Sequence, residues 1–144
     1  MQRPIHSNNN DNLSIYLPAI TDQNVAFVDY DGKGNTNKII QFNVAYGTNT
    51  TSYAAPYSVQ FAFPNGSTGG YLPAAGQSNI IFQNLTAIQN CLNACGGTAF
   101  SNESWCSTCY SYRATWRLNA ETGVYGDSWN ATNYMRVRVV SDYE

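Results

Sequence analysis

Charged residues are scarce in this sequence of 144 amino acids: 11% are Asp, Glu, Lys or Arg, against about 25% in an average soluble domain. Lysine is nearly absent, with only Lys33 and Lys38, and the formal net charge at pH 7 is -2. A protein that binds nucleic acid normally carries a basic patch and a high isoelectric point, so we expect no nucleic-acid partner. The surface must instead consist of amides, hydroxyls and phenols, as in many extracellular proteins and virion shells.

Histidine is also nearly absent, because His6 is the only one. It lies in a polar stretch far in sequence from the cysteines, which leaves no evident Ser-His or Cys-His pair. No G-x-S-x-G, P-loop or H-E-x-x-H pattern is present. We therefore expect a protein without enzymatic activity and without a cofactor. Two carboxylates that only folding brings together are the one catalytic arrangement that the sequence does not test.

Long apolar runs are missing as well. No stretch approaches the ~20 apolar residues that a membrane-spanning helix needs, so we expect no membrane insertion. The first twelve residues lack the apolar segment of a signal peptide. Together with Met1, this favours a protein that reaches the outside by assembly and lysis, as virion proteins do, over a mature form that has lost its signal. In both cases we expect an extracellular or virion-surface location.

An alternation of apolar and polar residues with a period of two dominates the chain. It is clearest over residues 40–46, 57–63, 110–118 and 135–139, and weaker over 13–20, 24–30 and 78–83. Such alternation is typical of antiparallel strands with one buried face, and turn signals separate most of the runs. The sequence therefore predicts a mainly β fold, an antiparallel β-sandwich or jelly-roll-like barrel of about seven strands.

The chain length fits a single domain. Residues 1–12 are polar and rich in Asn, so we expect a flexible or partner-docked N-terminal arm there. Residues 13–144 would form one β-rich domain. Strand donation by residues 13–20 to the sheet edge of another subunit is the assembly mechanism that this organisation predicts.

Residues 84–95 depart from the period of two. Their apolar side chains recur at helical spacing, and Gly96-Gly97 follows as a stop signal. This pattern predicts a short α-helix of about three turns, packed on an end or edge of the sheet.

The four cysteines are clustered around that predicted helix. Cys91 and Cys95 would lie on one helix face with Cβ atoms about 5–6 Å apart, farther than the ~3.5–4.5 Å of a disulfide. Both would instead reach the segment that holds Cys106 and Cys109. We expect two structural disulfides, most simply Cys91–Cys109 and Cys95–Cys106.

The same spacing allows a zinc site as an alternative. C-x3-C followed by C-x2-C is close to the patterns of structural zinc sites, so Cys91, Cys95, Cys106 and Cys109 would together hold one ion. No glycine-bearing knuckle lies near residues 106–109, which favours the disulfides. Free thiols are the third interpretation.

The run from Asp29 to Asn35, with its alternating acids and glycines, resembles the start of a calcium-binding loop. Lys33 at the fifth position and Ile40 at the twelfth do not fit the EF-hand pattern. We interpret the run as a hairpin turn between strands at 24–30 and 38–46.

Four of the five arginines fall on two predicted strands: Arg113 and Arg117, then Arg136 and Arg138. If these strands pair, the four side chains form one basic stripe. The stripe would bind an anionic glycan, a phosphate or an acidic neighbouring subunit. The alternative is a solvated sheet face that discourages edge-to-edge aggregation.

A polar loop carries Trp129 together with Tyr125 and Asp127. A flat apolar ring beside planar hydrogen-bonding groups is what a sugar site needs. A position in the core or in a subunit interface explains Trp129 equally well.

Six Asn-X-Ser/Thr sequons would accept N-linked glycans in a secreted protein. They lie at Asn12, Asn49, Asn65, Asn84, Asn102 and Asn130. The chain is so rich in Asn, Ser and Thr that chance accounts for several of them. Asn84 also has the position of a helix cap, which leaves the other five as candidate glycosylation sites.

These observations lead to three functional hypotheses. The first is a non-enzymatic structural subunit of an extracellular assembly, a virion capsid, decoration or appendage protein that self-assembles or contacts other structural subunits. The second is a secreted carbohydrate-binding or adhesive domain, similar to a pilus or filament subunit, with glycans as partners. The third is an intracellular module stabilised by zinc.

Overall fold

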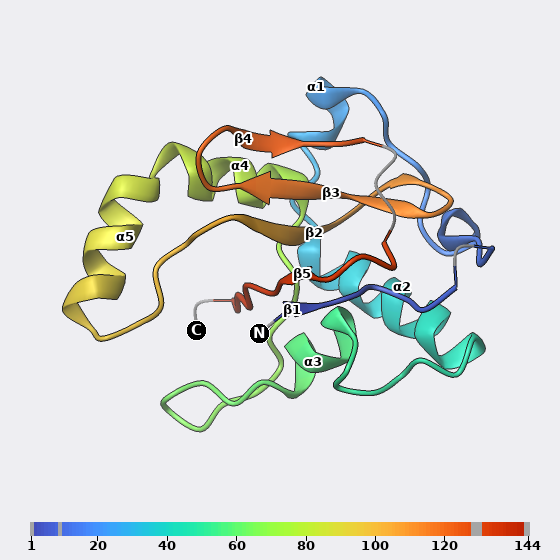
Figure 1. Ribbon diagram of the computed structural model, residues 1–144, viewed down its shortest axis with the longest axis horizontal. Helices are drawn as coiled ribbons and strands as arrows, with labels where there is room; N and C mark the ends of the chain where they lie inside the picture. Colours follow the sequence, from blue (N-terminus) through green and yellow to red (C-terminus); the bar gives the residue numbers. More distant parts are fainter. Residues whose placement is uncertain (1, 9, 128–130, 143–144) are drawn as a thin grey trace.

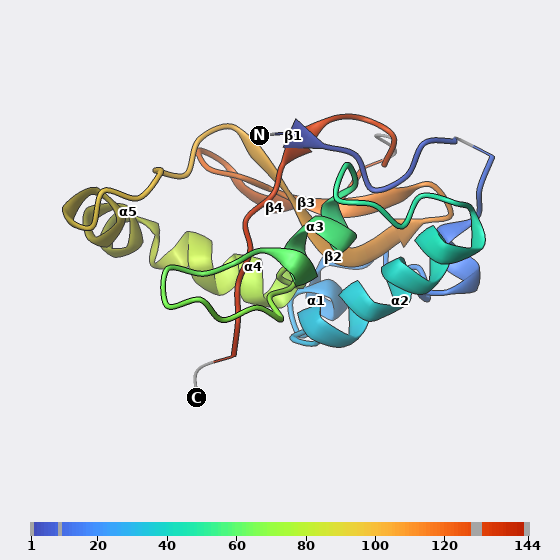
Figure 2. The same cartoon turned by 90° about the horizontal axis from the view of Figure 1, so that it is seen from below.

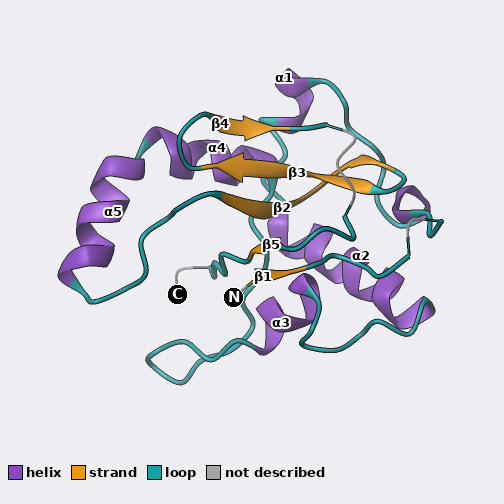
Figure 3. Cartoon of the chain, viewed as in Figure 1, coloured by secondary structure: helices purple, strands orange, loops and turns teal. Residues whose placement is uncertain are grey.

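A computed structural model describes residues 2–8, 10–127 and 131–142 of the chain (Figure 1). The described residues form a mixed α/β structure with one five-stranded sheet and five α-helices. The predicted antiparallel sandwich or barrel of about seven strands is therefore wrong. Figure 3 shows how much of the chain is helical.

The sheet combines the N-terminus with the last third of the chain. Its strands are β1 (Gln2–Arg3), β2 (Glu103–Ser111), β3 (Ala114–Asn119), β4 (Gly123–Tyr125) and β5 (Met135–Arg136). Their order across the sheet is β1-β5-β2-β3-β4. Neighbouring strands are antiparallel except β2 and β5, which are parallel and pair Ser104 with Arg136.

The helices occupy the middle of the chain. They are α1 (Gln23–Ala26), α2 (Gly32–Ala45), α3 (Ala54–Gln60), α4 (Ala75–Gln83) and α5 (Leu85–Ala94), preceded by the 3-10 turn η1 (Leu13–Ile15). Figure 2 shows α1, α2 and α4 on one side of the sheet, and Figures 1 and 2 both show α5 projecting from one end of the molecule. Among the described helices, none has the length and apolar character that a membrane span requires.

Helix α2 replaces the strand predicted at 40–46 and the hairpin turn predicted before it. Asp31 caps the helix, because its Oδ1 accepts a hydrogen bond from Gly34 N at 2.9 Å. Thr36, Ile39 and Asn43 are buried at spacings of three and four, while Val44 is 60% exposed. Two of these three buried residues are polar, so the pattern of apolar residues in the sequence does not show the helical period.

The other predicted strands are also wrong, because helices, a turn or shorter strands occupy their residues. Residues 13–20 contain η1, 24–30 begin inside α1, 57–63 begin inside α3, and 78–83 lie in α4. Residues 110–118 span a hairpin of two strands, and 135–139 form only the short β5. The helices α3 and α4 bury mainly small side chains, among them Ala55, Ser58, Ala75 and Ser78. The larger side chains alternate with a period of two and so indicated strands. They do not mark the buried faces of these helices, which carry small residues.

The helix predicted at 84–95 is present as α5, but its predicted packing on the sheet is wrong. Gly96 adopts a φ of 72°, and Gly97 N donates to Leu92 O at 2.7 Å. This is the Schellman ending that the glycine pair indicated. None of the ten residues of α5 is buried, so the helix has little cover from its own chain.

The N-terminal segment, expected as an arm, lies against its own chain in this structure. β1 pairs with β5, and Ile5 N donates to Ala131 O at 2.8 Å. Ile5 and His6 are fully buried. This segment therefore contributes to the core as well as to the sheet edge.

Buried apolar side chains form two clusters. The first contains Ile5, Leu13, Leu17, Ile39, Phe42, Ala54, Ala55, Leu72, Trp105, Cys109, Ala131 and Met135. The second contains Ala26, Ala75, Cys106, Trp116, Leu118 and Val124. Neighbouring residues of β2 enter different clusters, as the alternation of side chains along a strand requires.

Candidate functional site

The four cysteines do not come together in this structure. Cys91 on α5 and Cys95 directly after that helix are exposed, Cys106 and Cys109 are buried on β2, and all four are free thiols. Cys106 and Cys109 also belong to different apolar clusters. Within the described residues, no group of three or more His, Cys, Asp or Glu is placed to hold a metal ion. Both the two disulfides and the zinc site require the cysteine side chains to lie close together, and in this arrangement they do not.

The buried thiols are poorly suited to chemistry. Burial raises the pKa of Cys106 to about 12, and the charge of Asp29 adds to this effect while a hydrogen bond with Ser78 opposes it. Burial likewise raises the pKa of Cys109 to about 12. Since the thiolate is the nucleophile and the metal ligand, both side chains are inert at neutral pH.

The only histidine is part of the core. His6 is fully buried, and its ring meets that of Phe42 edge-on with centroids 5.2 Å apart. Burial is the main cause that lowers the pKa of His6, against opposing effects of Asp11 and the Asn8 backbone. A neutral imidazole enclosed in this way has no access to a substrate proton.

Three of the predicted contact residues meet in one internal network. Arg117 on β3 is only 2% exposed and forms ion pairs with Glu103, at 3.5 Å, and with Asp127. Its guanidinium lies 4.5 Å from the centroid of the Tyr125 ring, and the Tyr125 hydroxyl bonds to Glu103. The network ties β2, β3 and β4 together, and it engages the side chains that a sugar site would need. Trp129 and Asn130 lie outside the described residues.

The acids of the run 29–35 also have structural roles. Besides the cap that Asp31 supplies to α2, Asp29 Oδ2 accepts hydrogen bonds from Thr108 Oγ1 at 2.7 Å and from Asn35 Nδ2 at 2.8 Å. These contacts fix the α1–α2 loop on the sheet.

The predicted basic stripe is not formed, because β2 lies between β3 and β5 in the sheet. Arg113 stays at the β2–β3 turn, 5.2 Å from the ring centroid of Tyr112. Arg136 and Arg138 are separated from Arg113 and Arg117, and they line a cleft on another part of the surface.

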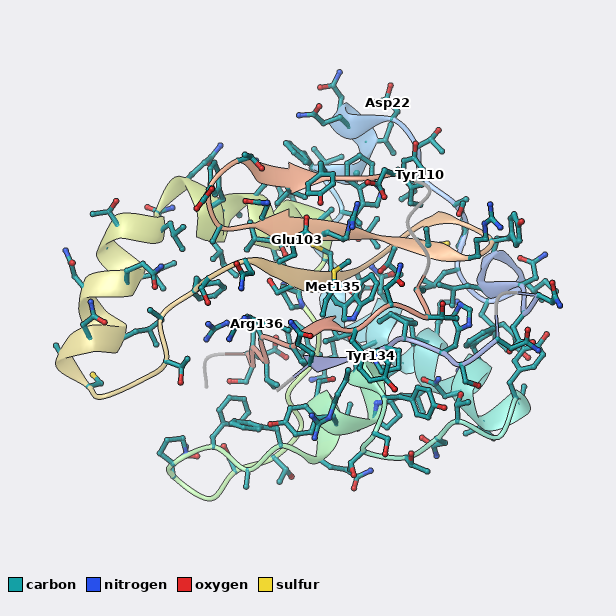
Figure 4. All side chains as sticks on the ribbon, viewed as in Figure 1. Asp22, Glu103, Tyr110, Tyr134, Met135 and Arg136 are labelled. Atoms are coloured by element: carbon teal, nitrogen blue, oxygen red, sulfur yellow. The ribbon has the colours of Figure 1, made fainter. Side chains whose placement is uncertain are left out.

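Arg136 and Arg138 line a cleft of about 310 Å³, which we call the Arg136 cleft. Residues from α3, α5 and the segment after β5 form its walls, and Figure 4 shows Arg136 between α5 and α3. Arg138 donates to the backbone oxygens of Thr98, at 2.8 Å, and Ala99. Burial, and then the charge of Arg136, lower the pKa of Arg138. The cleft thus holds two positive charges that affect each other.

A second surface lies where α4 turns into α5. A hollow of about 410 Å³, here called the α4–α5 elbow, is lined by Phe82, Gln83, Asn84, Leu85, Thr86, Ala87 and Asn90. Ile80 on α4 is 49% exposed. No Asp, Glu, Lys, Arg or His occurs between Lys38 and Glu103, so α3, α4 and α5 carry no charged side chain. Sequence analysis missed this surface, although the uncharged stretch is visible in the sequence.

The sequons differ in their surroundings. Asn49, Asn65 and Asn102 are exposed, whereas Asn12 caps η1 through its hydrogen bond with Ser14. Asn84 precedes the first residue of α5, but its side chain does not cap that helix; its Nδ2 donates instead to Ile80 O of α4 at 2.9 Å.

Comparison with known proteins found no matching family model, no similar curated protein and no similar solved structure.

Proposed function

We propose that this protein is a non-enzymatic structural subunit of an extracellular assembly, a virion shell, decoration or appendage component that contacts copies of itself. The observation that carries this proposal is the α4–α5 elbow, an uncharged and partly apolar surface on a helix that buries none of its residues.

Self-association suits this surface better than a charged partner does. The core of a protein interface is depleted in charge and enriched in apolar and aromatic side chains, and the elbow offers Phe82 and Leu85 with Ile80 beside it. In a twofold contact each copy presents the same patch. Identical uncharged patches meet without repulsion, and the amides of Gln83 and Asn90 supply hydrogen-bonding groups.

The non-enzymatic part of the proposal is supported by the side chains that usually carry catalysis. His6 is enclosed in the core, and the thiols of Cys106 and Cys109 are buried with raised pKa values. The extracellular location is supported by composition, since only 11% of residues are charged. Arg117, Tyr125 and Asp127 bind within one network, so the described residues offer no observation that favours the carbohydrate-binding hypothesis as a second candidate.

Sedimentation velocity over a range of protein concentrations tests the contact. Ala87→Asp places a charge in the elbow, and burying it in an interface would weaken association at least tenfold. Val28→Asp is the matched control, because Val28 is 65% exposed and lies outside the elbow. Concentration-dependent association that A87D weakens and V28D preserves is the expected result. A monomer at all concentrations, or equal effects of the two variants, would contradict the proposal.

Electron microscopy of the concentrated protein tests the step from contact to assembly. A twofold contact alone closes into a dimer, so a shell or filament needs a further interface. Ordered particles or filaments that A87D abolishes are expected. Dimers alone at every concentration would contradict the assembly role while leaving the elbow contact intact.

A further inference from the structure

We infer that the Arg136 cleft is a binding site for a small apolar molecule that carries a single anionic group. The two cationic side chains that line it, Arg136 and Arg138, face no acidic side chain among its described lining residues. This inference is independent of self-association through the elbow.

Arg136 is the central element of the site. Its Nε is buried, and no hydrogen-bond partner for it is present among the described residues. A buried nitrogen without a partner costs free energy, and a guanidinium is a fork of donors shaped for the oxygens of a carboxylate, sulfonate or phosphate. An anion in the cleft would pair with the Arg136 guanidinium and offset the positive charge that Arg136 and Arg138 bring to the lining.

Arg138 is already held in place for this role. The backbone oxygens of Thr98 and Ala99 accept two of its donors, and its guanidinium lies 4.3 Å from the ring centroid of Phe100. Carbonyl oxygens position the group without neutralising it. Its positive charge therefore remains available to a ligand, and little side-chain entropy is lost on binding.

A third cation adds to the positive field. The Arg3 guanidinium lies 3.9 Å from the centroid of the Tyr57 ring, and Tyr57 also lines the cleft. The nearest acid along the chain among the described residues, Asp142, is engaged elsewhere. It contacts Lys33 at 3.0 Å and Tyr71 at 2.9 Å.

The other walls are apolar and define the rest of the ligand. Phe61, Leu92, Val137 and Val139 line the cleft together with the Tyr57 ring. Its volume of about 310 Å³ lies at the lower end of the range for small-molecule sites, ~300–1,000 Å³. A polyanion would leave these walls unused, whereas a compact apolar body with one charged group fits both features.

Fluorescence titration of the full chain tests the inference with a matched pair of probes. 8-Anilinonaphthalene-1-sulfonate carries fused rings and one sulfonate, and N-phenyl-1-naphthylamine has the same rings without the charge. We expect saturable one-site binding of the sulfonate and at least tenfold weaker binding of the neutral compound, as the loss of a charge-assisted hydrogen bond implies. Equal affinities, or no saturable binding of the sulfonate up to ~1 mM, would overturn the site.

Substitution then locates the binding. Arg136→Gln removes the charge and should weaken sulfonate binding at least tenfold, while Arg113→Gln removes a charge at the distant β2–β3 turn and should leave binding unchanged. Arg136→Lys keeps the charge but not the planar fork, so an intermediate affinity is expected, and this variant replaces Arg136→Gln if that one does not fold. An unchanged affinity in the Arg136 variants, or equal losses at Arg113 and Arg136, would reject the assignment.

Discussion

Thr108 Oγ1 on β2 donates a hydrogen bond to Asp29 Oδ2 at 2.7 Å and accepts one from Ala75 N at 2.8 Å. One hydroxyl thus joins the α1–α2 loop and the first turn of α4 to the middle of the sheet. Thr108 is fully buried. If its hydroxyl is lost, Ala75 N loses its partner, while Asp29 Oδ2 keeps only the hydrogen bond from Asn35 Nδ2.

Thr108→Val is therefore expected to lower the free energy of unfolding by about 1–3 kcal/mol, because at constant side-chain shape it leaves Ala75 N without its hydrogen-bond partner and removes one of the two hydrogen bonds that Asp29 Oδ2 accepts. Urea denaturation followed by circular dichroism measures the change. Thr115→Val is the control: Thr115 is equally buried on β3, but its Oγ1 has no hydrogen-bond partner among the described residues. The control should be neutral or stabilising, and equal losses in the two variants would contradict this account.

Gly76→Ala should destabilise the protein although alanine is the better helix former. A Cβ at Gly76 would lie 2.6 Å from Asp29 O and 2.7 Å from Phe27 O, and backbone atoms do not yield as a flexible side chain does. The gain in helix propensity is about 1 kcal/mol, whereas overpacking costs about 1–3 kcal/mol or more. The midpoint of thermal unfolding is expected to fall.

The control for this change is Asn93→Ala on α5, where the side chain is exposed and lies outside the elbow. Its small gain in propensity meets no steric cost, so the midpoint should stay the same or rise slightly. A Gly76→Ala protein that is as stable as the wild type would mean that α4 and the α1–α2 loop do not approach as closely as described.

The sequence predicted the one amphipathic helix and its glycine ending but failed on the other helices. The apolar pattern in α5 includes Leu85, Ile88 and Leu92 at helical spacing, and this spacing is informative even though no residue of α5 is buried. In α2 the buried positions include Thr36 and Asn43. Asn43 Nδ2 bonds to Ile5 O at 3.0 Å and to Thr48 Oγ1 at 2.7 Å, partners that no local pattern identifies.

The predicted surfaces failed for a related reason: a strand pattern does not give strand order. Arg117 was placed with Arg136 because both lie on short alternating segments, yet β2 separates their strands. Arg117, Tyr125 and Asp127 do converge, but on Glu103. The pairing of Glu103 on β2 with Asn119 on β3 brings this acid near Arg117. Only the folded register supplies that information.

Acidification should destabilise the protein through His6. Burial lowers its pKa in the folded state, while the unfolded chain keeps a value near ~6.5. As the pH falls below about 6.5, the unfolded state takes up the proton first, and the free energy of unfolding decreases until the pH reaches the folded pKa, by at most about 1.4 kcal/mol per pH unit. The stabilising contribution of neutral His6 is thus fully present only above that range.

Urea unfolding of the wild type and of His6→Phe at pH 7 and pH 5 tests this expectation. The aromatic variant keeps a ring next to Phe42 but has no proton to take up. Its loss of stability between the two pH values should be smaller than that of the wild type. Equal losses would show that the acid sensitivity arises from other groups.

The cysteines should divide into two reactive and two protected thiols. Cys91 on α5 and Cys95 at the end of that helix are exposed, whereas burial raises the pKa of both Cys106 and Cys109 to about 12. Native protein prepared without reductant should therefore release two equivalents of thionitrobenzoate rapidly from Ellman's reagent at pH 8, and two more only after guanidinium is added. A Cys91→Ser/Cys95→Ser double variant should lose the rapid phase and keep the slow one.

Absence of all reaction in guanidinium would instead establish the two disulfides that the sequence predicted. Four thiols that become reactive only as zinc is released would establish the metal site.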